Sequence, residues 1–328
     1  MNLQRLCDAL LASRGFAHKR DISPVMRQLS PVLPAGIRVG DDCAAIPDGD
    51  GHLLFAIEGF VEDFVEKMPW FAGYCGVMVN VSDIYAMGGR PLAVVDAVWS
   101  AGSQAGAPVL EGLSEASRRY GVPIVGGHTN ARTERSQLAV AIVGRAKRLL
   151  TSFDARPGDK LLMAIDLRGE WQHPYPYWNA STSAPAERLR ADLELFPALA
   201  ESGLCDAAKD ISMAGAIGTA LMLLECSKAG ASIDIDAIPR PDGIDLDDEA
   251  ALLRWLTAFP SYGFVLSVGG PHVDGVLGRF RERGIACAVV GQVHALPQVT
   301  LCHAGQTATL WDVAAQAFIT AGDESRQG

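Results

Sequence analysis

The sequence predicts a soluble α/β protein with more than one domain, from its length, its composition and the order of its apolar segments. A chain of 328 residues is long enough for two hydrophobic cores. Hydrophobic residues make up 49%, charged residues 20%, and there are 34 glycines, which is typical of soluble α/β proteins. Strand-like runs alternate with helical stretches, as expected for an α/β layer.

The first half shows this alternation most clearly. Apolar residues at helical spacing predict a short helix at the start, and the prolines at 24, 31 and 34 indicate a connecting arm after it. A Gly-Gly-Arg-Pro sequence ends the helix around Asp83. The expected elements are a helix at 2–13, strands at 53–57, 92–99, 123–125 and 137–146, and helices at 70–87 and 109–120.

The turn Arg156-Pro157-Gly158-Asp159 marks the expected domain boundary, because the pattern starts again beyond it. The second half predicts strands at 160–165, 232–235, 262–268 and 285–293, and helices at 185–202, 214–229, 245–258 and 271–283. We expect an N-terminal helix and arm over residues 1–37, and an N-terminal α/β domain over 38–155 that binds the nucleotide and metal and dimerises. A C-terminal α+β domain should follow over 156–310, and a tail over 311–328, of which 323–328 should be frayed.

The net charge and the cysteine content argue against several classes of protein. The net charge of −10 argues against general affinity for nucleic acid or an anionic membrane, although a nucleotide can bind where metal ions reverse the local field. The seven cysteines are scattered, which favours reduced thiols; Cys43 could be reactive or simply a small buried residue. Neither a signal peptide nor a membrane-spanning segment is apparent, so we expect a cytoplasmic protein.

Four polar fragments recur among small residues and suggest one shared site. They are Gly40-Asp41-Asp42, Asn80-Val81-Ser82-Asp83, Gly126-Gly127-His128-Thr129 and Lys209-Asp210-Ile211-Ser212. Carboxylates suit Mg²⁺, and two or more such ions can neutralise a triphosphate and align it for phosphoryl transfer. Neither a P-loop nor a convincing dinucleotide-binding glycine motif competes with this interpretation.

Individual roles follow from spacing. Asp42 and Asp83 are the best metal ligands, and Asp41 either shares a metal or caps the turn through backbone N–H groups. Asn80 precedes Asp83 by three residues, which places both on one helix face as a ligand pair requires, although an exposed polar face is the plainer alternative.

The later fragments predict phosphate contacts. Gly126 and Gly127 let backbone approach phosphate oxygens beside Thr129, and His128 could meet a phosphate or metal, or be a structural histidine. Ser212 could cap a helix that begins at Met213, with its N–H groups directed at an anion. Asp210 would then bind metal and Lys209 a phosphate.

Two further segments have alternative explanations. Residues 171–178 carry four aromatic side chains and two prolines, which could form a lid on a flat substrate or simply pack onto their own domain. The acidic cluster at 242–249 could bind metal, but acidic residues in a helix's first turn favour a capping role.

Taken together, the four fragments resemble the aminoimidazole ribonucleotide (AIR) synthetase superfamily over roughly residues 38–295. The Asn-x-Ser-Asp-x-x-Ala-Met-Gly sequence from Asn80 to Gly88, in order with the others, carries the resemblance. The resemblance implies an N-terminal α/β domain whose sheet forms a barrel across a homodimer, and a C-terminal α+β domain. It also implies ATP and Mg²⁺ as cofactors, with Asp42, Asp83 and Asp210 at metal and phosphate positions and Asn80 in support. We expect Asp42, His128 and Lys209 to act in catalysis.

Departures from known members leave the substrate open. Thiamine-monophosphate kinase has Gly-Gly-Asp where this chain has Gly126-Gly127-His128, and selenophosphate synthetase has an N-terminal reactive Cys or Sec that is absent here. We therefore expect an ATP-dependent kinase or synthetase acting on a small metabolite. The alternatives are a nucleotide-binding scaffold that serves a partner enzyme and a metal-dependent hydrolase.

Overall fold

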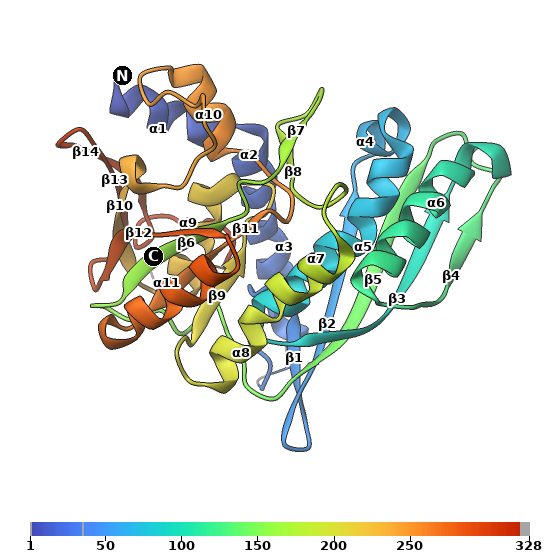
Figure 1. The fold of residues 1–328 in the computed structure, drawn as a ribbon, viewed down its shortest axis with the longest axis horizontal. Helices are drawn as coiled ribbons and strands as arrows, with labels where there is room; N and C mark the ends of the chain where they lie inside the picture. Colours follow the sequence, from blue (N-terminus) through green and yellow to red (C-terminus); the bar gives the residue numbers. More distant parts are fainter. Residues whose placement is uncertain (1, 35, 322–328) are drawn as a thin grey trace. The chain divides into compact units, whose positions relative to one another are not determined.

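The computed structural model describes residues 2–34 and 36–321, which belong to two compact units (Figure 1). Unit 1 comprises Met1–Asp41, Leu150–Thr182 and Ser202–Gly328. Unit 2 comprises Asp42–Leu149 and Ser183–Glu201. Each unit has its own sheet and helices, and each is assembled from segments that are far apart in the sequence.

Unit 2 is built on a five-stranded mixed sheet in the order β1-β2-β5-β3-β4. All neighbours are antiparallel except β3 and β4, which are parallel and joined by helix α6 (Ser103–Tyr120), as a parallel pair requires. Within the described residues the sheet has two open edges, β1 and β4, and no barrel closes. The strands are β1 (Ala44–Asp48), β2 (Gly51–Phe60), β3 (Arg90–Trp99), β4 (Ile124–Asn130) and β5 (Gln137–Ala146).

Helix α5 (Pro69–Ala86) forms the core of unit 2, where it packs on the sheet and on α6. Pro69 occupies its first turn, where a missing N–H costs nothing, and Gly88 at φ 72° follows its end. Glycine also sets the spacing of the two helices, because a Cβ at Gly73 would lie 2.0 Å from the Val109 carbonyl oxygen. The other unit 2 helices are α4 (Glu62–Lys67), α7 (Ala186–Leu193) and α8 (Leu195–Glu201).

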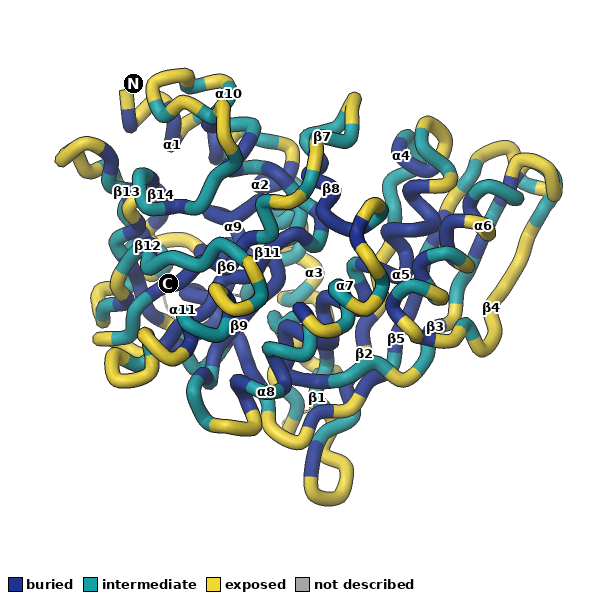
Figure 2. Tube along the Cα trace, in the orientation of Figure 1, coloured by how far each residue is buried: buried dark blue, intermediate teal, exposed yellow. Residues whose placement is uncertain are grey.

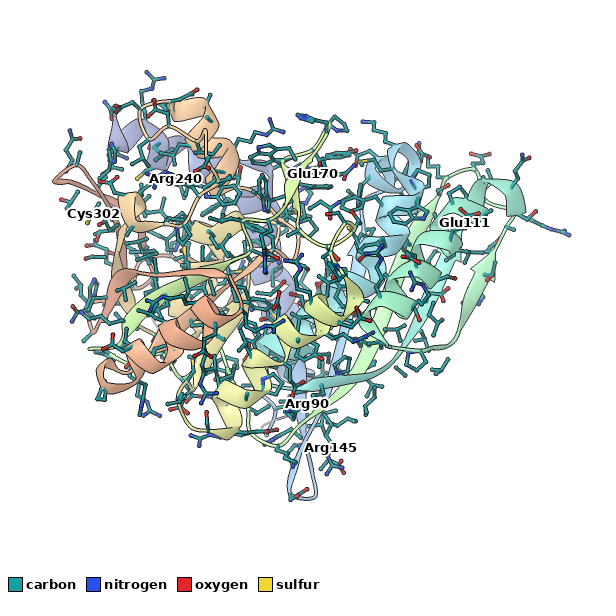
Figure 3. All side chains as sticks on the ribbon, in the orientation of Figure 1. Arg90, Glu111, Arg145, Glu170, Arg240 and Cys302 are labelled. Atoms are coloured by element: carbon teal, nitrogen blue, oxygen red, sulfur yellow. The ribbon has the colours of Figure 1, made fainter. Side chains whose placement is uncertain are left out.

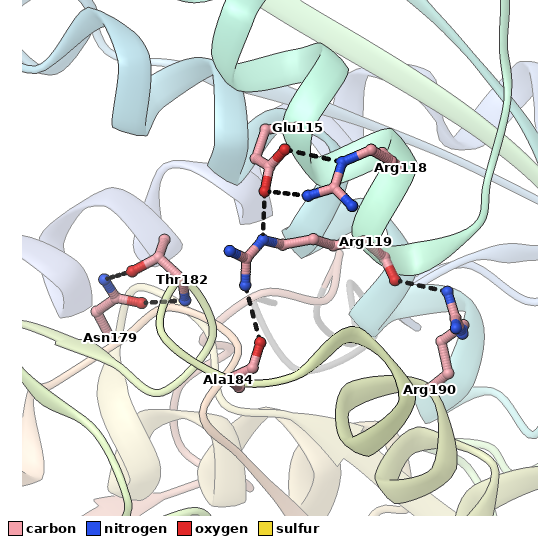
Figure 4. Close-up of polar contacts among 7 residues, drawn as sticks. All are labelled: Glu115, Arg118, Arg119, Asn179, Thr182, Ala184 and Arg190. Atoms are coloured by element: carbon pink, nitrogen blue, oxygen red, sulfur yellow. Dashed lines mark hydrogen bonds and ion pairs between the residues drawn. The ribbon is translucent and has the colours of Figure 1, made fainter.

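The segment that carries α7 and α8 is attached to the rest of unit 2 by arginines. Arg119 Nη1 donates to the Ala184 carbonyl at 2.8 Å (Figure 4). Arg90, which is labelled in Figure 3, forms an ion pair with Glu194 and donates to Glu201 Oε1 at 2.6 Å. These contacts make a segment from the middle of the chain part of the N-terminal unit.

Unit 1 contains a seven-stranded mixed sheet in the order β14-β13-β10-β12-β6-β11-β9 and a large apolar core. Its strands are β6 (Lys160–Ile165), β9 (Ala207–Asp210), β10 (Gly230–Asp234), β11 (Gly263–Val268), β12 (Ala286–His294), β13 (Gln298–His303) and β14 (Gln306–Asp312). Its helices are α1 (Leu3–Ala12), α2 (Arg14–Arg20), α3 (Ile22–Leu29), α9 (Gly215–Cys226), α10 (Glu249–Leu256) and α11 (Val273–Glu282), with 3₁₀ turns at Ser30–Val32, Ile235–Ala237 and Gly270–His272.

Several predicted elements are corrected. The expected connecting arm is mostly helical, because α2 and α3 follow α1 directly and Pro24 falls in the first turn of α3, where proline is tolerated. The single helix expected at 185–202 is two helices, α7 and α8. The acidic cluster does act as a cap, since the Asp248 side chain accepts from the N–H groups of Ala250 and Ala251.

The aromatic segment forms a small hairpin, β7 (Glu170–Gln172) and β8 (Tyr177–Asn179), in unit 1. Its rings contact rings of the same unit: Trp171 lies edge-on to Trp178 and Trp255, at 5.3 and 6.0 Å between centroids. Tyr177 lies 4.6 Å from the Phe259 ring. The alternative in which the loop packs onto its own domain accounts for these contacts.

Two expectations concern termini and membranes. The frayed end expected at 323–328 lies outside the described residues. In the part of the chain that the structure describes, no helix combines the length and the apolar character needed to cross a bilayer. Cys43 is buried, as are four of the other cysteines.

Candidate metal centre

Asp42 and Asp83 bring two carboxylates together in unit 2. Asp42 lies just before β1, and Asp83 lies in the last turn of α5 and is 5% exposed. A carboxylate oxygen of Asp42 lies within 4.8 Å of one of Asp83. Two ionised carboxylates at this separation repel each other unless a cation lies nearby, so the pair is suited to a divalent metal.

Asn80 is fixed on the same helix by its amide. Its Nδ2 donates to the Gly76 carbonyl at 2.8 Å and to the Val140 carbonyl of β5 at 3.0 Å. Its Oδ1 is buried and accepts no hydrogen bond from the described residues. Asn80 is therefore not part of an exposed polar face, since it joins α5 to the sheet and leaves an oxygen available close to Asp83 in sequence.

This donor set fits Mg²⁺. Magnesium binds oxygen ligands and keeps several waters, so one or two carboxylates suffice when phosphate oxygens complete the coordination. Asp42 and Asp83 could supply the carboxylates. Asn80 Oδ1, on the same helix as Asp83, is a buried neutral oxygen that accepts no hydrogen bond from the described residues. No thiolate or imidazole is part of the acidic group, which also disfavours zinc.

Asp41 has a structural bond that spacing alone could not reveal. Its Oδ2 accepts the Ser152 N–H at 2.9 Å and its Oδ1 accepts the Ser152 hydroxyl at 2.6 Å, both within unit 1. Ser152 is fully buried, and its carbonyl accepts from the Ser227 hydroxyl at 2.8 Å. Ser152 thus fixes Asp41, the residue that immediately precedes Asp42, and it is a contributor that the sequence interpretation missed.

The glycine-histidine fragment lies in a strand and not in a loop. Gly126, Gly127, His128 and Thr129 all belong to β4, the exposed edge strand of unit 2 (Figure 2). The expected strand at 123–125 is therefore longer, because the glycine backbone pairs with β3. His128 is exposed, and its ring lies 6.3 Å from that of Trp99.

Lys209, Asp210 and Ser212 belong to unit 1. Lys209 and Asp210 are buried in β9, opposite Val265 and Phe264 of β11. The cap expected of Ser212 is wrong, because α9 begins at Gly215 with Ala214 at its N-cap and no side chain caps it. Instead, the Ser212 backbone N–H donates to the Thr219 hydroxyl at 3.1 Å. The roles of these three residues in binding stay predictions.

Comparison with known proteins assigns both halves of the chain to one family. The family models "AIR synthase related protein, N-terminal domain" and "AIR synthase related protein, C-terminal domain" match residues 40–146 and 168–302. An uncharacterized protein of Synechocystis is 48% identical, with 91% of this chain and 92% of that protein covered. An uncharacterized protein of Methanocaldococcus jannaschii is 36% identical, with 89% and 91% covered. A selenide, water dikinase of Myxococcus xanthus is 28% identical, with 64% and 62% covered.

Solved structures share the fold at lower identity. T. maritima PurL complexed with ATP is 18% identical, with a TM-score of 0.69 over 86% of this chain. The match spans 47% of that protein, so this chain has about half the length of PurL. AaThiL complexed with AMPPCP and TMP is also 18% identical, with a TM-score of 0.62, 84% of this chain covered and 90% of that one. At these identities the likeness establishes the two-domain fold alone.

Proposed function

This chain belongs to the AIR synthase related proteins, and from that premise we propose that it is an ATP-dependent, Mg²⁺-requiring enzyme that activates a small metabolite by phosphoryl transfer or an ATP-driven synthetase reaction. The Asp42 and Asp83 pair carries the proposal, since two close carboxylates form a suitable place for the cation of a metal–triphosphate complex. Relatives named as a dikinase and a monophosphate kinase, and similar folds with bound ATP and AMPPCP, support it.

The residues of this chain would have distinct tasks in that reaction. Asp42 and Asp83 would hold Mg²⁺ with Asn80 in support, and Asp210 would add a third carboxylate from unit 1. When bound there, Mg²⁺ would neutralise charge on the triphosphate. Lys209 would contact a phosphate oxygen, and the exposed strand β4 would offer the backbone of Gly126 and Gly127, with His128 and Thr129, to the nucleotide.

We also propose that the chain forms a homodimer through the sheet face of unit 2 opposite α5. Phe55 and Ile57 of β2 and Val95 of β3 are 51%, 66% and 41% exposed on that face. Ile57 and Val95 both lie beside Ala141 in the sheet. Contiguous exposed apolar side chains of this kind mark association surfaces, and a second copy could pair with the open sheet to form the barrel that the family resemblance implies.

Calorimetric titration with AMPPCP tests the enzyme proposal. The full chain should bind the nucleotide when Mg²⁺ is present and lose at least about tenfold in affinity without it, because the charged triphosphate needs its cation. Asp83→Asn should weaken binding similarly, whereas Asp50→Asn, an exposed carboxylate on the β1–β2 turn of the same unit, should change it by less than about twofold.

The outcomes separate the alternatives. Metal-independent binding that Asp83→Asn leaves unchanged would contradict the proposal. Binding without ADP formation from any acceptor would favour the nucleotide-binding scaffold. Phosphate release from simple phosphoesters without ATP would favour the hydrolase.

A further inference from the structure

Asp96 is an acidic residue in an otherwise apolar row of β3. It lies opposite Val140 of β5, whose side chain faces α5, since a Cβ at Gly76 would lie 2.8 Å from Val140 Cγ2. Residues directly opposite each other in an antiparallel pair project to the same face. Asp96 therefore lies on the face that α5 packs against, between Val94 and Val98, which are 1% and 2% exposed.

The carboxylate of Asp96 lies against the edge strand. Gly127 is its neighbour in β4, and a Cβ built there would lie 2.9 Å from both Cγ and Oδ1 of Asp96. It would also lie 2.6 Å from the Asp96 carbonyl oxygen. A side chain at position 127 would therefore displace the carboxylate. The glycine keeps space for Asp96, and its own strand is exposed (Figure 2).

The carboxylate of Asp96 is unpartnered among the described residues. Across residues 2–34 and 36–321, no group donates a hydrogen bond to its carboxylate or forms an ion pair with it. Partial burial raises the pKa of Asp96 above its ordinary value, with no opposing interaction. A partly buried carboxylate without a partner destabilises the ligand-free protein. Carboxylates of this kind are common at sites where the group binds a ligand.

Asp96 is close in the fold to the candidate metal centre but is not part of it. The Val140 carbonyl that accepts from Asn80 Nδ2 belongs to the residue opposite Asp96. Asp83 is three residues from Asn80 on the same helix. Asp96 does not belong with the close carboxylates of Asp42 and Asp83. Asp96 is therefore one strand away from Val140, the residue that anchors Asn80. Its carboxylate is available to a ligand other than the metal ion.

We propose that Asp96 binds the acceptor substrate by accepting a hydrogen bond from an N–H or O–H group on it. The inference rests on the proposed function, because it concerns the molecule that receives the activated group. It also limits the substrate class: the acceptor presents a neutral or cationic donor at this position, since a phosphate or carboxylate would be repelled by Asp96.

Acceptor-dependent ADP formation tests the inference. The full chain is supplied with Mg·ATP and with a deproteinised small-molecule cell extract separated into cationic, neutral and anionic fractions. We expect one of these fractions to stimulate ADP release. Asp96→Asn should lower kcat/KM for that fraction at least about tenfold, the loss expected when one charged hydrogen bond is removed. Its affinity for Mg·AMPPCP should stay within about twofold of the original, since Asp96 does not hold the cation.

Glu111→Gln is the matched control, because Glu111 is an exposed carboxylate on α6 of the same unit (Figure 3). It should leave both measurements within about twofold. Asp96→Ala, which removes both acceptor oxygens as well as the charge, should lower kcat/KM at least as much as Asp96→Asn does. A structural role for Asp96 would show instead as a lower unfolding temperature of both variants.

Two results would overturn the inference: unchanged kcat/KM in Asp96→Asn, or a chain that binds nucleotide while no fraction stimulates ADP release. Failure of the unchanged chain to bind Mg·AMPPCP is a separate observation that counts against the proposed function itself.

Discussion

Asp41 holds Ser152 through both of its carboxylate oxygens, at 2.9 Å from the backbone nitrogen and 2.6 Å from the hydroxyl. The two residues are 111 positions apart in the sequence. Within unit 1 this contact joins the end of the first segment to the beginning of the second. Asp41 thus has a structural task, whereas its neighbour Asp42 is a candidate metal ligand.

Replacing Asp41 should destabilise the fold. Asp41→Ala leaves the buried Ser152 N–H and hydroxyl without these acceptors, so the free energy of unfolding should fall by about 1–3 kcal/mol. Urea denaturation measures the change. Asp50→Ala removes an exposed carboxylate and should cost less than about 0.5 kcal/mol. Equal stability of the two variants would show that the Ser152 contact contributes nothing.

Magnesium should stabilise the protein through the carboxylate pair. At about one hundred times its dissociation constant, an ion that binds only the folded state adds about 2.7 kcal/mol. Thermal unfolding with and without MgCl₂ should therefore show a rise for the unchanged chain and little or none for Asp83→Asn. Asp48→Asn, at the last residue of β1, should retain the full rise. A rise that survives in Asp83→Asn would place the cation elsewhere.

A charge on the exposed sheet face should prevent dimerisation. Ile57→Lys would bury an ammonium group against the second copy, which costs several kcal/mol, so light scattering should report a monomer. Leu110→Lys changes a residue of α6 that is 45% exposed and should leave the dimer intact. If the unchanged chain is itself monomeric, the dimer proposal is wrong.

The stability of Asp96→Asn should depend on pH. Because the folded-state pKa of Asp96 is raised, the folded protein holds this proton more tightly, and stability is lost as pH rises from the unfolded pKa through the folded pKa. Asp96→Asn removes that loss, so it should unfold at a higher temperature than the unchanged chain at neutral pH. The difference should vanish below the unfolded pKa of about 3.9. Melting curves across this range measure it, and a less stable variant at pH 7 would contradict the prediction.

Local patterns predicted the regular elements well, since apolar runs and glycine stops depend on neighbouring residues. The strand at 160–165 and the long helix that carries Asp83 are examples. The helical character of 14–29 was missed because its proline suggested an arm, although Pro24 falls where a helix tolerates it. Strands β13 and β14, which mix polar and apolar residues, also gave no clear pattern.

The candidate site was only partly accessible from the sequence. The spacing of Asn80 and Asp83 correctly indicated one helix face, but not that Val140, 60 residues away, accepts the Asn80 amide. The sequence does indicate that Asp96 is unusual, because it is a single acidic residue between Val94 and Val98 on the apolar face of a predicted strand. Its lack of a partner in the part of the chain that the structure describes, however, follows from strand pairing that the sequence does not specify.

The chain enters unit 2 at Asp42, leaves it after Leu149, and returns for the short stretch that carries α7 and α8. A truncation after Leu149 would therefore discard the carboxylates that Arg90 pairs with, as well as the carbonyl that Arg119 holds. No single cut separates two complete folding units. To produce unit 2 alone therefore requires a circularly permuted gene, or co-expression of the peptide Ser183–Glu201 that carries α7 and α8.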